Sequence, residues 1–193
     1  MKKYKYFTLL AILFTTILLA QKPKKLTSNQ IFEKVQKLNF LGTALYIAAH
    51  PDDENTRLIS YLANNVKART AYLSLTRGDG GQNLIGPEIR ELLGLIRTQE
   101  LLGARRVDGG EQLFTRANDF GYSKHPKETL EFWDKEKVLS DVVWAIRKFK
   151  PDVIINRFNH RTPGTTHGHH TTSAMLSVEA FDLAANKTKY PEQ

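Results

Sequence analysis

The stretch YIAAHPDDENTR, residues 46–57, passes within twelve residues from an apolar run to a histidine, a proline and three acids. The apolar part extends back to Gly42 and predicts a buried strand, and residues 53–67 have the apolar spacing of a helix. A buried strand that runs directly into a helix is typical of α/β proteins, in which ligands bind beyond the carboxyl ends of the strands.

The rest of the chain repeats this alternation. A helix is predicted at residues 27–38, where Thr27 and Gln30 have the spacing of a capping box. Further strands are predicted at 69–76, 111–116 and 152–158, and further helices at 87–106, 136–150 and 169–185. Pro87, after the glycine-bearing loop 77–86, is expected to open its helix. The pattern predicts an α/β fold: a Rossmann-like, mostly parallel sheet with helices on both faces, in three α/β/α layers.

Composition limits the classes of protein to which the chain can belong. Its 193 residues suit one domain with a sizeable core. The 28 lysines and arginines exceed the 20 acids, but they are scattered rather than gathered in a basic stripe, which argues against nucleic acid as a partner. The absence of cysteine excludes disulfides, thiolate metal sites and a cysteine nucleophile.

Residues 1–20 have the pattern of a signal peptide. Lys2, Lys3 and Lys5 precede an apolar run that ends at Ala20. We expect cleavage after Ala20, export to the periplasm or the extracellular space, and contact with the membrane only through this segment before cleavage. The alternative is an uncleaved anchor, although the run is short for a membrane span. Removing the three lysines lowers the formal charge from +8 to +5.

The remaining chain divides into a helical lead-in, residues 21–40, and one folded domain, residues 41–193. The last predicted helix is followed by no predicted strand, which leaves open that this domain is truncated at its C-terminus.

The acids that follow the first strand suggest a metal. Asp52, Asp53 and Glu54 would repel one another unless a cation lay nearby. His50 and Asp53 have the i, i+3 spacing that brings two side chains to one face, and imidazole with carboxylate is a ligand set suited to Zn²⁺. The alternative is that the acids favour a helix N-terminus while His50 is a core residue. This motif alone does not decide between them.

A second cluster, NHRTPGTTHGHHTTSAM at residues 159–175, holds four of the six histidines of the chain: His160, His167, His169 and His170. It follows the fourth predicted strand. His50, Asp53 and one of these histidines would give three ligands and leave a position for water, as in catalytic zinc sites. Asp52 would then accept a proton from the water, and a second histidine would stabilise or protonate the tetrahedral intermediate. His125, far from both motifs, is expected at the surface.

Together these motifs resemble the PIG-L or LmbE-like N-acetylglucosaminyl deacetylases. In that family a strand leads into H-P-D-D-E, here His50 to Glu54, and H-x-x-H follows late in the domain at a helix start, here His167 to His170. The resemblance extends from Leu41 to Phe181. It includes LTRGDGG, IRTQELLGA and KPDVIINR at residues 75–81, 96–104 and 150–157.

The resemblance implies a role for each matching residue. His50, Asp53 and His170 would bind zinc or another divalent metal, Asp52 would be the general base, and His167 the acid or electrophilic partner. Arg97 would contact substrate, although an ion pair with Glu100 is equally consistent with its position. Many relatives have Asp where this chain has His169, so His169 is either a second candidate ligand or a change in the hydrogen bonding behind the ligands.

The activity implied is that of a zinc-dependent hydrolase that removes an acetyl group from an N-acetylated amino sugar, such as an N-acetylglucosamine-type glycan, with a metal-activated water. One alternative is a metal-dependent amidase acting on another amide, such as a thiol conjugate. The other is a non-catalytic glycan-binding module whose metal shapes the site. The presence of both Asp52 and His167 argues against a module, because binding alone needs neither a base nor an acid.

Overall fold

The computed structural model describes residues 25–193, so the predicted signal peptide lies outside the described range. The chain divides into an N-terminal unit up to Gln36 and a second unit, Lys37–Gln193, and each is described by itself. Helix α2 (Ser28–Lys37) confirms the first predicted helix. Its capping box is also confirmed: the Thr27 N–H donates to Gln30 Oε1 (3.0 Å), and the Gln30 N–H donates to Thr27 Oγ1 (3.3 Å).

The second unit alternates strands and helices. In chain order they are β1 (Thr43–Ala48), α3 (Thr56–Ser60), β2 (Arg69–Ser74), α4 (Glu91–Asp108), β3 (Glu111–Phe114), α5 (Pro126–Phe132), α6 (Lys135–Phe149), β4 (Val153–Asn156) and α7 (Gly168–Ala184). All strand pairs are parallel, and the spatial order is β3-β2-β1-β4. The chain reverses direction across the sheet between β1 and β4, which is where ligands bind in such folds.

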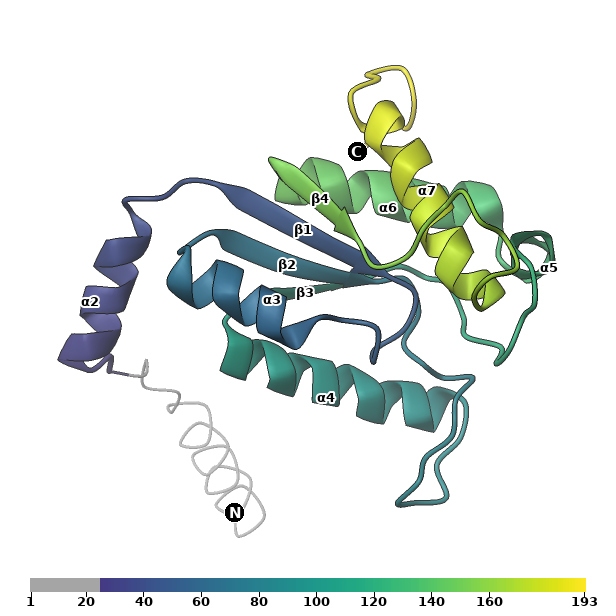
Figure 1. Cartoon of the computed structure of the whole chain (residues 1–193), viewed down its shortest axis with the longest axis horizontal. Coiled ribbons are helices and arrows are strands. Elements are labelled where there is room, and N and C mark those ends of the chain that lie inside the picture. The colour runs from purple at the N-terminus through teal and green to yellow at the C-terminus, as the bar shows by residue number, and fades with distance from the viewer. Residues whose placement is uncertain (1–24) are drawn as a thin grey trace, which may run out of the picture. The chain divides into compact units, whose positions relative to one another are not determined.

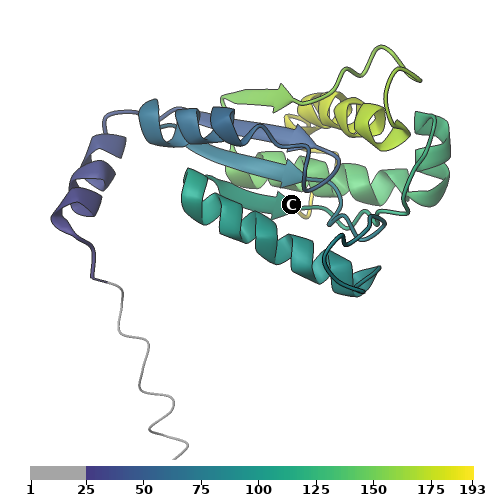
Figure 2. The same cartoon turned by 60° about the horizontal axis from the view of Figure 1, so that its bottom comes forward.

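Helices cover both faces of the sheet, with α3 and α4 on one side and α6 and α7 on the other (Figures 1 and 2). Successive side chains of a strand point to opposite faces. Tyr46 of β1 accordingly packs with Ile59 and Leu101 under the first pair of helices. Leu45 packs with Leu176 under the second pair. The predicted three-layer α/β/α fold is confirmed.

The helix after β1 is shorter than predicted and begins later. It starts at Thr56 because Asn55 caps it, with Asn55 Oδ1 accepting the Leu58 N–H (3.0 Å). After Ser60 the chain continues as one π-helical turn, Tyr61–Asn65. Residues 51–54 therefore form a turn before the helix, and their side chains can contact residues other than those of α3.

Two other features differ from the prediction. Pro87 does not open α4, because Arg90 has a left-handed backbone (φ 54°) and the helix begins only at Glu91. Helix α5 was not predicted. It is capped by His125, whose Nδ1 accepts the Lys127 N–H (3.3 Å), and the ring of His125 is exposed, as expected.

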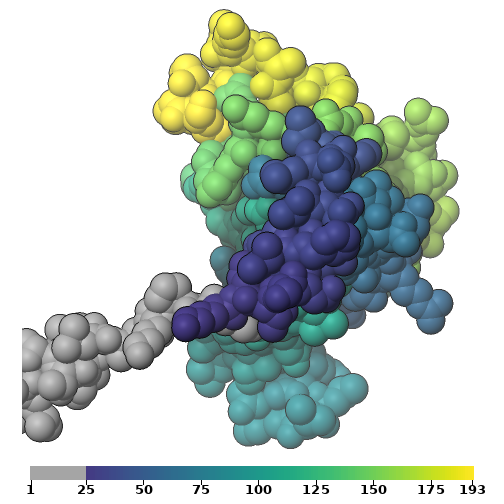
Figure 3. Space-filling model, turned by 90° about the vertical axis from the view of Figure 1, so that its left-hand side faces the viewer, coloured from purple at the N-terminus to yellow at the C-terminus, as the bar shows by residue number. Residues whose placement is uncertain are grey.

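Two segments project at opposite ends of this unit: the loop of residues 77–90 after β2, and the chain after α7 (Figures 1 and 3). In the loop, Leu84 and Ile85 are almost fully exposed. Among the described residues, none of the helices has the length and apolar character needed to cross a bilayer.

Truncating Leu139 of α6 to alanine should destabilise the fold strongly. The side chain is 1% exposed between the sheet and α7, so Leu139→Ala leaves a cavity and should lower the free energy of unfolding by about 2–5 kcal/mol. Leu84→Ala removes the same atoms from an exposed site and should change it by less than about 0.5 kcal/mol. Urea unfolding followed by circular dichroism measures both, and equal effects would contradict the assigned core.

Candidate metal centre

A tight turn at the carboxyl end of β1 positions His50. The Ala49 carbonyl accepts hydrogen bonds from both the backbone N–H and the hydroxyl of Thr76 (both 2.9 Å). The hydroxyl of Tyr72, in β2, donates to the His50 carbonyl. The Asp53 N–H donates to the same carbonyl (3.2 Å), so the chain turns back and places the Asp53 side chain beside His50.

Asp53 joins the two histidines of the predicted ligand set. Its Oδ2 accepts the backbone N–H of His50 (2.7 Å) and lies 3.2 Å from His50 Nδ1. Its Oδ1 lies 3.4 Å from Nε2 of His170, which comes from the first turn of α7. The structure therefore brings His50, Asp53 and His170 together, with one ligand atom of each within 4.8 Å of the others.

This donor set fits a divalent metal. Tetrahedral zinc bonds nitrogen and oxygen at about 2.0–2.1 Å, which separates neighbouring ligand atoms by about 3.3 Å. His50 Nδ1 lies 3.2 Å from Asp53 Oδ2 and His170 Nε2 lies 3.4 Å from Asp53 Oδ1, so each imidazole has one carboxylate oxygen at about this separation. Two imidazoles and a carboxylate also leave a fourth position for water or substrate, as catalytic zinc sites do.

The start of α7 is held closely against the chain between β3 and α5. His167 is the N-cap, and its Nδ1 accepts the His169 N–H (3.1 Å). A Cβ on Gly168 would lie 2.5 Å from Ser123 Oγ, so only glycine permits this approach. The His170 ring stacks on Phe158, which follows β4, with 3.9 Å between ring centroids. These contacts fix the ring of His170 toward Asp53.

Asp52 points away from the ligand set and toward solvent. Its side chain is 71% exposed, and its Oδ1 lies 3.4 Å from Nη2 of Arg97 on α4. Gly78, with a left-handed φ of 69°, makes room for this arginine, because a Cβ there would lie 2.9 Å from Arg97 Cδ. Arg97 is thus ion-paired with the predicted base, and not with Glu100.

Glu54, the last acid of the motif, faces away from the histidines. Its Oε1 lies 3.4 Å from Nη2 of Arg105, which also binds Asp108 at 2.6 Å. Burial raises the pKa of Glu54 above its ordinary value, although Arg105 opposes this. Glu54 ties the turn after β1 to α4 and takes no direct part in the centre.

His167 lies at the edge of the centre with both ring nitrogens engaged. Since Nδ1 accepts a backbone N–H, the ring proton is on Nε2, which donates to the Gly121 carbonyl (3.1 Å). Burial, together with the charge of His50, lowers the pKa of His167. The ring is therefore a neutral hydrogen-bond donor.

The ionisation states of Asp53 and His170 favour metal binding. Burial would raise the pKa of Asp53, but its contacts with His50 and His170 outweigh this and lower it. Burial lowers the pKa of His170 to about 4 despite the nearby Asp53. For His50 burial acts in the same direction, but Asp53, Asp119 and Asp52 outweigh it and raise its pKa. At neutral pH Asp53 is ionised and His170 neutral, the states in which each can ligate.

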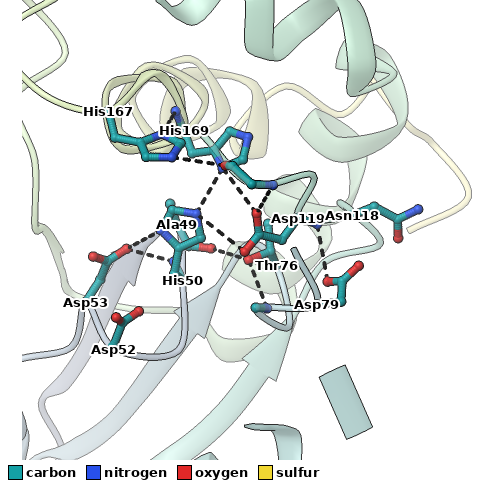
Figure 4. A network of polar contacts seen from close by, with 12 residues as sticks. Ala49, His50, Asp52, Asp53, Thr76, Asp79, Asn118, Asp119, His167 and His169 are labelled. Carbon is teal, nitrogen blue, oxygen red and sulfur yellow. Dashed lines mark hydrogen bonds and ion pairs between the residues drawn. The ribbon is translucent and has the colours of Figure 1, made fainter. Parts of the chain in front are cut away.

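Asp119 is a member of this network that the sequence analysis missed. It is buried, with Oδ2 3.9 Å from His50 Nε2 and Oδ1 3.7 Å from His169 Nδ1. Its N–H donates to Asp79 Oδ1 (3.2 Å). Figure 4 shows Asp119 and Asp53 on opposite sides of the His50 ring. The available signal was its place shortly after β3, at the same edge of the sheet.

His169, left open between two roles, lies behind the ligand set. Its Nδ1 is 2.9 Å from His50 Nε2. Burial lowers its pKa to about 2, so the ring is neutral. The fourth histidine of the cluster, His160, contacts the Arg161 side chain (3.3 Å) and does not join the centre.

A hollow of about 890 Å³ lies near the centre but is separate from it. It is lined by Arg77, Asp79, Phe114 and Trp144 among others, and the four histidines are not part of its lining. Asn118 also lines it, and its side chain points away from His50 (Figure 4). We therefore assign the candidate active site to the cluster of histidines and not to this hollow.

Known proteins resemble this chain in sequence. The PIG-L model, described as GlcNAc-PI de-N-acetylase, matches residues 45–181. Mycothiol S-conjugate amidase from Streptomyces coelicolor is 27% identical over 159 residues, which are 76% of this chain and 54% of that protein. The chain thus spans about half the length of this curated relative.

Solved structures share the fold. N,N'-diacetylchitobiose deacetylase from Pyrococcus horikoshii has a TM-score of 0.61 at 18% identity, over 89% of this chain and 64% of that one. The 4-carboxy-2-hydroxymuconate hydratase GalB from Pseudomonas putida has a TM-score of 0.56 at 16% identity, over 77% and 58%. These two proteins catalyse different reactions, so the fold alone does not assign one.

The match to the family model is stronger evidence than the shared fold. It covers more than half of the chain and includes both the HPDDE turn and the start of α7. The relatives that define this group are deacetylases and amidases, which are hydrolytic enzymes. The chain belongs to the PIG-L family.

Proposed function

We propose that this chain is a metal-dependent amidohydrolase that removes the acetyl group from an N-acetylated amino sugar. The proposal depends on one observation: two neighbouring acids of the same turn have different surroundings. Asp53 contacts both His50 and His170, whereas Asp52 is exposed and pairs with Arg97. A ligand set with an adjacent accessible base is what amide hydrolysis requires. The family description names N-deacetylation, which supports this substrate class.

His50, Asp53 and His170 would hold the metal. When bound, a divalent metal such as zinc supplies Lewis acidity, which polarises a carbonyl oxygen and makes water a better nucleophile at neutral pH. Asp52, whose carboxylate is 71% exposed, would turn toward the ligand set and accept the proton of the attacking water. Arg97 orients that carboxylate through their ion pair, in which the two groups lie 3.4 Å apart.

His167 completes the reaction on the other side of the substrate. Its Nε2–H now donates to the Gly121 carbonyl, and it would turn this hydrogen bond to the oxygen or nitrogen of the scissile amide. The water oxygen bonds to the acyl carbon, the C–N bond breaks, and the proton taken by Asp52 passes to the departing nitrogen. The products are acetate and a free amine.

A second candidate is a metal-dependent amidase that acts on a thiol conjugate. The curated relative from Streptomyces coelicolor bears the name of such an enzyme, which favours this reading. The same residues would perform the same hydrolysis, so the two candidates differ only in the substrate. A glycan-binding module is disfavoured because Asp52 and Arg97 form an ion pair next to the ligand set that binding alone does not need.

Replacing Asp52 should separate chemistry from metal binding. Asp52→Asn removes the base, and amide hydrolysis should fall by about 10²–10⁴-fold. The bound metal should be unchanged, because Asp52 is not a ligand. Asp182→Asn changes an exposed acid near the end of α7 and is the matched control. Full activity in Asp52→Asn, or loss of metal with the activity, would contradict the assigned role.

The ligand set itself predicts loss of metal. His50→Ala and His170→Ala should each reduce bound metal below one equivalent after dialysis, because only two ligands remain in each variant. His125→Ala, which removes an exposed ring, should keep the full equivalent. Elemental analysis of folded protein, checked by circular dichroism, measures this, and a full equivalent in either ligand variant refutes the set.

The substrate class is tested by what is released. Purified protein supplied with zinc should liberate acetate from N-acetylglucosamine-containing glycans, and acetate can be quantified with a coupled enzymatic assay. Release of amine from a thiol-conjugate amide, without acetate from any acetylated sugar, would favour the second candidate instead.

We also propose that residues 1–20 direct export, as their charged start and apolar run indicate. The protein recovered from the periplasm or medium of an expressing bacterium should then begin at Gln21. N-terminal sequencing provides the measurement. An intact N-terminus starting at Met1 in the membrane fraction would show an anchor.

A further inference from the structure

We propose that His169 is a positioning residue: it accepts a hydrogen bond from Nε2–H of His50 and thereby directs the Nδ1 lone pair of His50 at the metal. This inference rests on the metal centre of the proposed function, and it assigns a role to a residue that neither binds the metal nor touches substrate. It also chooses between the two roles that the sequence left open for His169.

Only one proton can lie between the facing nitrogens of the His50 and His169 rings. His50 Nε2 and His169 Nδ1 are 2.9 Å apart, a normal hydrogen-bond distance, so one nitrogen donates and the other accepts. The other nitrogen of His50, Nδ1, faces Asp53 Oδ2 at 3.2 Å. A metal held with Asp53 requires Nδ1 to be unprotonated. The shared proton must then be on His50 Nε2, and His169 must be the acceptor.

The surroundings of His169 hold its ring in this orientation. The side chain is fully buried, stacked on Trp133 with 4.9 Å between ring centroids and packed edgewise against Phe120 at 4.4 Å. Its Nε2 has no hydrogen-bond partner among the described residues. Polar contacts of the ring are therefore on the Nδ1 side, toward His50. A buried nitrogen without a partner costs free energy of folding, so packing alone does not account for a histidine at this position.

Asp119 supports this hydrogen bond by its charge. Its Oδ2 lies 3.9 Å from His50 Nε2 and its Oδ1 lies 3.7 Å from His169 Nδ1, so the carboxylate faces the proton that the two rings share (Figure 4). The carboxylate is held in place because its Oδ1 accepts the Gly121 N–H (2.9 Å). His50 thus has a carboxylate on each side: Asp53 at the metal-facing nitrogen and Asp119 at the protonated one.

The alternative is a second metal held by His50, His167 and His169, whose ring nitrogens also converge. His167 argues against it, because Nδ1 already accepts the His169 N–H and Nε2 donates to Gly121. A metal bound by these three rings would break one of the two hydrogen bonds of His167. It would also break the hydrogen bond between His50 and His169. The structure therefore favours a hydrogen bond over a second metal.

Two substitutions at position 169 separate hydrogen bonding from packing. His169→Leu fills the pocket but cannot accept a hydrogen bond, and should weaken zinc binding about 10–100-fold. His169→Asn offers its Oδ1 near the position of Nδ1 and should restore affinity close to that of the unchanged protein. His160→Leu, in the same cluster but outside the centre, is the control. Competition with a chromogenic chelator measures zinc affinity, and circular dichroism confirms folding.

The ring protons can also be observed directly in the unchanged protein. In the zinc complex of histidine-labelled protein, two-bond ¹H–¹⁵N spectra should show His50 protonated on Nε2 and metallated on Nδ1, with His169 Nδ1 unprotonated. A proton on His169 Nδ1, zinc on His50 Nε2, or a second equivalent of zinc that His169→Leu removes would overturn the inference. This measurement decides the matter even if His169→Leu does not fold.

The outcomes distinguish this inference from the proposed function. If His169→Leu weakens zinc binding and His169→Asn restores it, but no amide is hydrolysed, the positioning role stands and the proposed function fails. If His169→Leu binds zinc as tightly as the unchanged, active enzyme does, the positioning role fails and the proposed function stands.

Discussion

The contact between Asp53 and His50 is the interaction on which the rest of the centre depends. Asp53 binds the backbone N–H of His50 and reaches its Nδ1, so the turn that ends β1 also prepares two ligands. Because β1 lies between β2 and β4, both neighbours contribute: Tyr72 of β2 holds the His50 carbonyl, and the chain after β4 supplies His170. The partly buried Asp53 carboxylate at this strand end accepts the N–H of His50 and lies beside the rings of His50 and His170, and a bound metal would add to its stabilisation.

The topology explains how residues more than a hundred positions apart meet. After β1 the chain builds β2 and β3 on one side and then crosses to form β4 on the other, so the strand order reverses between β1 and β4, where ligands bind in such folds. His50 follows β1 and His170 lies in the first turn of α7, which follows β4. Other strand ends at the same edge supply Asp79 and Asp119. The site is therefore a product of strand order as much as of motif sequence.

The sequence was sufficient for the features that depend on local pattern, and insufficient for those set by long-range packing. Apolar periodicity located the four strands. The spacing of His50 and Asp53, with the later histidine cluster, predicted a metal site, and the family resemblance identified His170 as its third ligand, in the cluster that the structure shows. Asp119 belongs to no recognisable sequence motif. Its role depends on its position in the fold, on the side of the His50 ring opposite Asp53. The predicted start of α4 was wrong because Arg90 has a positive φ. Arginine rarely adopts this backbone conformation, so the sequence gives no signal for it.

The central claim is that one divalent metal is held by His50 Nδ1, Asp53 and His170 Nε2. Anomalous diffraction above and below the zinc absorption edge, on crystals grown with zinc, tests this most directly. The account predicts a single strong peak within bonding distance, about 2.0–2.2 Å, of those three side chains. A peak at His50 Nε2 and His169 instead, or none at either place in zinc-containing crystals, would contradict it.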